Sequence, residues 1–102
     1  MWPFSSKHKI VQKIKAGAWG KLVQQGIDVD TLTRDIRCVE KQGAVNGGTP
    51  VTYLRVFKLS EAAEKGVNIQ GWETFDQYPD LVLFEGYINS YSNQAVLEKK
   101  RP

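Results

Sequence analysis

The sequence predicts an α+β domain in which a three-stranded, mostly antiparallel sheet is covered by helices on one face. Three observations support this fold class: helical spacing of apolar residues over 9–25, an Asn-Gly turn between two strand-like runs, and an apolar run at 81–88. A length of 102 residues fits one domain, 1–102, with residues 1–8 and 99–102 expected to be flexible. With 41% hydrophobic and 25% charged residues, the chain has the composition of a folded protein.

Helical periodicity begins at Lys9 and continues to Gln25. Its apolar positions are Ile10, Val11, Ile14, Ala18, Leu22 and Val23. Gly26 is suited to cap the C-terminal end of this helix. Gly17 and Gly20 interrupt it, which predicts either a kink or close approach of another backbone.

Residues 27–33 leave two interpretations open. Alternating apolar and polar residues favour a linker or the entry to a strand. Alternatively, Asp30 caps a helix that carries Leu32, Ile36 and Val39.

The strongest local signal is a β-hairpin formed by residues 36–45 and 51–59. Asn46-Gly47 supplies the positive φ angles of a tight turn, and Pro50 is expected outside the paired region because it has no N–H to donate. The second run is rich in β-branched and aromatic residues and is apolar on both faces, which predicts a central strand.

The remaining elements complete the order α-β-β-α-(α)-β-α. Residues 60–66 predict a short helix with Ser60 as N-cap and Gly66 as terminator, and residues 67–69 a brief extended piece. Trp72, Phe75 and Tyr78 share one side of a second short helix that Pro79 ends. Residues 81–88 predict a strand, parallel to 51–59 through a right-handed crossover. A turn at 89–93 and a terminal helix over 94–100 follow.

Charge is distributed unevenly along the chain. Residues 1–27 carry five lysines and no acid, whereas residues 28–98 hold six basic residues and all eleven acids; the formal net charge is +3. A basic segment on an acidic body indicates either an anionic partner or docking of the first helix onto its own domain.

No catalytic or metal-binding constellation is visible in the sequence, and we expect neither enzyme activity nor a cofactor. The single histidine, His8, has no predictable partner, and Cys38 is expected to be a small buried apolar residue in a strand. Asp76 and Asp80 flank a turn but lack the ligand spacing of a calcium loop, so turn and capping roles explain them. The glycine-rich stretch 43–48 precedes a strand rather than a helix, which indicates a hairpin turn and not a phosphate loop.

Aromatic residues are the main candidates for function. Trp72, Phe75 and Phe84 are interpreted as core, whereas Trp19, Tyr78, Tyr87 and Tyr91 are the candidate binding residues. The first hypothesis is therefore a non-catalytic binding or regulatory module that contacts a protein partner or a second copy of itself, with an open strand edge as one route. No small-molecule ligand is implied.

Two alternatives remain open. A nucleic-acid-binding domain would use the basic N-terminal helix, with Lys7, Lys9, Lys13, Lys15 and Lys21 in contact with phosphates. A small enzyme with a carboxylate- or tyrosine-based site is the remoter alternative. Trp2 and Phe4 beside the lysines could also contact a membrane surface. The sequence gives this interpretation little support, because the lysines do not segregate on one helix face. Without an apolar h-region of a secretory signal or a cysteine pair, the expected location is cytoplasmic.

Overall fold

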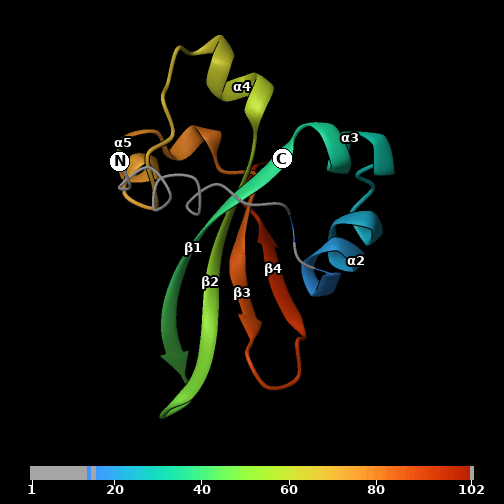
Figure 1. The fold of residues 1–102 in the computed structure, drawn as a ribbon, viewed down its shortest axis with the longest axis vertical. Coiled ribbons are helices and arrows are strands. Elements are labelled where there is room, and N and C mark those ends of the chain that lie inside the picture. Colours follow the sequence, from blue (N-terminus) through green and yellow to red (C-terminus); the bar gives the residue numbers. More distant parts are fainter. Residues whose placement is uncertain (1–13, 15, 102) are drawn as a thin grey trace, which may run out of the picture.

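The computed structural model describes residues 14 and 16–101, which build a four-stranded antiparallel sheet (Figure 1). Its strands are β1 (Ile36–Val45), β2 (Thr49–Lys58), β3 (Phe84–Asn89) and β4 (Ala95–Lys99), in the order β1-β2-β3-β4. The α+β class and the antiparallel sheet are confirmed, but the sheet has four strands and not the three that we predicted.

The β1–β2 hairpin is present where the sequence predicted it. Asn46, Gly47 and Gly48 all have positive φ, as the turn requires. Pro50 was expected outside the paired region, yet it lies in β2 opposite Ala44. Pairing of β2 with β3 begins only at the next residue, Val51, so the missing N–H of Pro50 falls at the end of that ladder.

Strand β3 runs antiparallel to β2, which corrects the predicted parallel arrangement. The connection between the two strands, residues 59–83, includes helix α4 (Leu59–Glu64) and stays at one end of the sheet. Its last residue, Leu83, donates its N–H to the carbonyl of Val56, so β3 begins beside the end of β2.

The predicted terminal helix over 94–100 is instead strand β4, and the predicted order of helices and strands changes accordingly. Asn89 turns the chain, because its side-chain Oδ1 accepts hydrogen bonds from the N–H groups of Tyr91 and Ser92. Pairing with β3 then outweighs the modest helix preference of a segment too short to be helical alone. Residues 99–102, expected to be flexible, include Lys99 at the end of β4 and Arg101, which pairs with Glu61.

Helices cover both faces of the sheet, not one face as predicted. Helices α2 (Ala16–Gln24) and α3 (Val29–Arg34) cover the face that carries Ile36, Cys38, Leu54, Val56 and Phe84, here called the α2 face. Helices α4 and α5 (Thr74–Gln77) and the 3-10 turn η1 (Pro79–Leu81) cover one end of the other face, the α5 face, over Val39 and Phe57. In Figure 1, α2 and α3 lie to the right of the strands, and α4 and α5 lie at the top and upper left.

The described part of the first helix ends as the sequence predicted. Gly26 has a φ of 93°, and the N–H of Ile27 donates to the carbonyl of Leu22. Gly17 marks a close backbone approach, because a Cβ there would overlap the carbonyl oxygen of Asn93. Gly20 has open space around it. Residues 9–13 and 15 of the predicted helix lie outside the described residues.

The two short helices α3 and α4 are capped differently from the prediction. Asp28, not Asp30, caps α3, and its Oδ1 accepts the backbone N–H of Thr31 at 2.8 Å. This hydrogen bond, with a second from the Thr31 hydroxyl, holds the pKa of Asp28 below its usual value. Ser60 is not the N-cap of α4; its N–H and hydroxyl both donate to the carboxylate of Asp35. Asp35 thereby ties the start of β1 to the end of β2.

None of the helices in the described part of the chain is long and apolar enough to cross a membrane. Cys38 is fully buried on the α2 face, as predicted for a small apolar strand residue. Phe75 and Phe84 are also buried, in agreement with their interpretation as core, but Trp72 is only half-buried.

Candidate binding cleft

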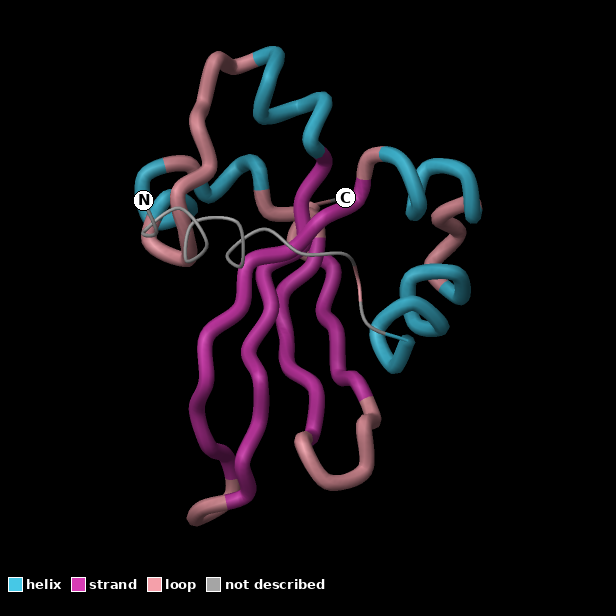
Figure 2. The backbone as a smooth tube through the Cα atoms, viewed as in Figure 1, coloured by secondary structure: helices cyan, strands magenta, loops and turns pink. Residues whose placement is uncertain are grey.

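A cleft of about 740 Å³ opens beside β1, one of the two outer strands of the sheet. Glu40 and Lys41 line it from β1, and the segment 66–78 lines the rest of it. Figure 2 shows this segment, the loop between α4 and α5 together with α5, beside the sheet. The cleft therefore lies between an outer strand and the segment 66–78.

Local sequence explains how segment 66–78 leaves the sheet and returns. Gly66 has a φ of 68° and reverses the chain after α4, while the N–H of Val67 donates to the carbonyl of Ala62. At the far end, the hydroxyl oxygen of Thr74 accepts the N–H groups of Gln70 and Gly71. These contacts satisfy the backbone where the loop turns into α5.

Arg55 fastens this segment to the α5 face. Its side chain is only 16% exposed, and its Nη1 donates to the carbonyl of Trp72 at 2.8 Å. The same guanidinium lies 4.2 Å from the centre of the Trp72 ring and pairs with Asp76 and Glu85. One side chain thus joins β2, β3 and segment 66–78, called the cleft loop below.

Three aromatic rings extend from the cleft across the α5 face. Tyr53 lies 6.5 Å from Trp72 and 6.1 Å from Tyr87, with ring planes steeply inclined in both pairs. Gly43 makes room for Tyr53, because a Cβ at Gly43 would overlap the tyrosine ring. Lys41 adds a positive charge 5.9 Å from the Trp72 ring, beside the cleft.

The four aromatic residues predicted to bind do not form one site. Tyr78, at the end of α5, lines the cleft and is 38% exposed. Tyr87 is half-buried and belongs to the adjoining ring cluster. Trp19 packs from α2 against the opposite core, and Tyr91, 82% exposed, lies in the β3–β4 turn. The structure therefore brings Tyr78 and Tyr87 to one face of the sheet and separates them from the other two.

The basic residues of the nucleic-acid alternative are mostly outside the described chain. Lys21 is exposed on α2, whereas Lys7, Lys9, Lys13 and Lys15, like His8, lie in the part for which no structure is given. Among residues 14 and 16–101, no three His, Cys, Asp or Glu side chains are grouped as metal ligands would be.

Sequence reasoning missed Tyr53, Arg55 and Trp72 as site residues. Arg55 offered a signal, since an arginine between the apolar residues Leu54 and Val56 of a central strand requires acidic or carbonyl partners when buried. Those partners, the Trp72 carbonyl, Asp76 and Glu85, lie 17 to 30 residues further along the chain.

Chemically, the cleft combines two aromatic side chains, charges of both signs, and the side-chain amides of Asn68, Gln70 and Gln77. These groups suit non-covalent recognition of a polar chain, in which hydrogen bonds fix orientation and rings supply contact area. Models of known protein families, curated proteins and solved structures gave no match to this chain.

Proposed function

We propose that the protein is a small non-catalytic binding or regulatory module that acts through protein–protein contact, with an extended segment of the partner seated in the cleft beside β1. The observation that carries this proposal is the position of the cleft along an outer strand. A polypeptide that pairs with a strand edge gains main-chain hydrogen bonds, and its alternate side chains reach an adjoining pocket.

The composition of the cleft supports a polar, reversible partner. Lys41 and Glu73 carry opposite charges, and Trp72 and Tyr78 offer aromatic surface among amide groups. Tyrosine, tryptophan and charged side chains at the rim are typical of interfaces that form and separate, whereas permanent interfaces are more apolar. A second copy of the chain is included among such partners.

Peptides selected from a random display library provide the test. We expect a selected peptide to perturb the amide NMR signals of residues 40–45 and 66–78. Tyr78→Ala should weaken its binding by about tenfold, the usual effect of removing an aromatic anchor. Tyr91→Ala is the matched control, because it also removes an exposed tyrosine side chain, but from the β3–β4 turn and away from the cleft. Equal loss in both variants, or no effect of Tyr78→Ala, would contradict the cleft as the binding site.

Sedimentation at low and physiological salt separates the partner classes. Self-association that persists in salt and is lost in Tyr78→Ala supports a second copy as the partner. A monomer that shifts only with mixed-sequence nucleic acid, and only at low salt, supports the nucleic-acid alternative instead.

A further inference from the structure

A second cavity, of about 310 Å³, lies at the end of the α2 face where β2 ends. Segments distant in sequence converge on it: the α2–α3 connection, the end of β2, α4, the start of β3, and the residues from Lys99 onward. Its volume is at the lower end of the range for small-molecule sites, roughly 300–1,000 Å³. The cavity is distinct from the cleft beside β1, with which it shares no lining residue.

Among the residues that the structure describes, three cationic side chains line this cavity against one acid. Lys58 comes from β2, Lys99 from β4, and Arg101 from the residues that follow β4. Strand register explains the convergence, since Lys99 pairs with Phe84 and Phe84 pairs with Val56, two residues before Lys58 on the same strand face. Like charges so placed repel one another unless an anion joins them.

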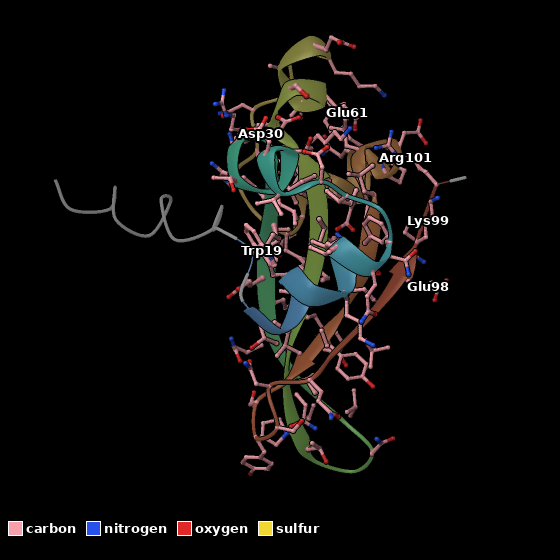
Figure 3. All side chains as sticks on the ribbon, turned by 90° about the vertical axis from the view of Figure 1, so that its right-hand side faces the viewer. Trp19, Asp30, Glu61, Glu98, Lys99 and Arg101 are labelled. Carbon is pink, nitrogen blue, oxygen red and sulfur yellow. The ribbon has the colours of Figure 1, made fainter. Side chains whose placement is uncertain are left out.

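The single acid, Glu61, neutralises only one of these cations. It pairs with Nη2 of Arg101 at 2.6 Å, and Figure 3 shows Glu61, Arg101 and Lys99 on the same side of the molecule. The Nε of Arg101 is buried and has no hydrogen-bond partner among the described residues. A buried donor without an acceptor is unfavourable, so this atom points to an acceptor that a ligand would bring.

Apart from Gln25, the rest of the lining is apolar. Ile27, Leu83 and Phe84 supply aliphatic and aromatic surface next to the cations, and Phe84 is part of the buried core. A ligand matched to this cavity therefore has a charged end and an apolar body, since inorganic ions alone would leave the apolar surface uncovered.

We propose that this cavity binds a small organic anion, with a carboxylate or phosphate head group held by Lys58, Lys99 and Arg101 and an apolar body against Phe84. Carboxylates and phosphates share the oxygen acceptors that guanidinium and ammonium groups bind through charge-assisted hydrogen bonds. Neither the cleft beside β1 nor the proposed protein contact is required for this site.

The test uses the full chain in low-chloride buffer, with phenyl phosphate, benzoate and inorganic phosphate as probes. We expect saturable NMR shifts at Ile27, Leu83 and Phe84 with at least one of the two aromatic anions, and weaker binding of inorganic phosphate. The stronger of the two aromatic probes identifies the head group. Lys99→Gln should weaken that probe's binding by about tenfold, the scale of a lost charge-assisted hydrogen bond.

Two further variants make the result specific. Lys100→Gln removes the same charge one residue away, from an exposed side chain that does not line the cavity, and should leave binding unchanged. Glu61→Gln releases Arg101 from its ion pair and should tighten binding, a gain that a misfolded variant would not produce. No saturable binding, equal losses in Lys99→Gln and Lys100→Gln, weaker binding in Glu61→Gln, or inorganic phosphate binding as tightly as the aromatic anions would overturn the proposal.

Discussion

Replacement of Arg55 by methionine tests how the cleft loop is held. Methionine keeps an unbranched apolar stem of similar reach, so the variant removes chiefly the guanidinium. That group binds the Trp72 carbonyl, stacks on the Trp72 ring, and pairs with Asp76 and Glu85. Its removal leaves the carbonyl and two carboxylates without their cation.

The expected loss of unfolding free energy follows from these contacts. A hydrogen bond from a charged group contributes about 1.5–3 kcal/mol, and a largely desolvated cation–π contact about 1–2 kcal/mol. The ion pairs add little, because the Asp76 and Glu85 side chains are 59% and 36% exposed and solvent-screened pairs contribute about 0–1 kcal/mol. Since these contributions are not additive, we expect Arg55→Met to cost about 2–4 kcal/mol.

Urea denaturation measures this loss, and hydrogen exchange locates it. We expect a lower midpoint at unchanged m-value, with the largest increase in exchange at residues 70–77. Arg34→Met is the matched control: Arg34 pairs with Asp30, but its side chain is 79% exposed, so we expect a change of about 0.5 kcal/mol or less. A cost below about 0.5 kcal/mol for Arg55→Met, or equal costs in the two variants, would refute this account of the loop.

Two further predictions concern α2 and α3. Gly20→Ala should raise the free energy of unfolding by up to about 1 kcal/mol, because alanine favours a helix and nothing lies near the new Cβ. Gly17→Ala should give no such gain, since the new Cβ would overlap the Asn93 carbonyl. Thermal denaturation measures both variants, and equal gains would contradict the close approach at Gly17. Asp28→Ala should destabilise the protein at neutral pH. Because the pKa of Asp28 is lowered on folding, its contribution is complete above about pH 4 and is lost as the pH falls through the folded-state pKa, so stability curves of the two proteins should converge in acid. A difference that does not depend on pH would show that the hydrogen bonds to this carboxylate are not its source.

The sequence was informative where structure depends on neighbouring residues. Residues 36–58 form a hairpin because Asn46 and the two glycines after it favour positive φ and the flanking runs favour strands, and the structure has this hairpin with its predicted first strand. Gly26 and Gly66 likewise end helices for reasons that lie within one turn of chain. The same local logic left a kink or a close approach open at Gly17; the structure shows the close approach and its partner, Asn93.

The candidate sites were only partly accessible to such reasoning. Tyr78 was one of the aromatic residues proposed to bind, and it lines the cleft. Trp72 was assigned to the core. One sequence does not reveal that the guanidinium of Arg55 packs over the Trp72 ring. The cavity of Lys58, Lys99 and Arg101 had no sequence signal, since these three cations are up to 43 positions apart and are brought together by strand pairing.

The sequence by itself determined the α+β class, the β1–β2 hairpin and the burial of residues such as Cys38 and Phe75, because composition and local turn chemistry act over a few residues. Only the tertiary structure decided that residues 95–99 form a strand, that β3 runs antiparallel to β2, and that helices cover both faces of the sheet. The physical reason is that a short segment with weak intrinsic preference adopts the conformation that its partners stabilise. For β4 that partner is β3, whose free edge gains a full ladder of hydrogen bonds when residues 95–99 pair with it.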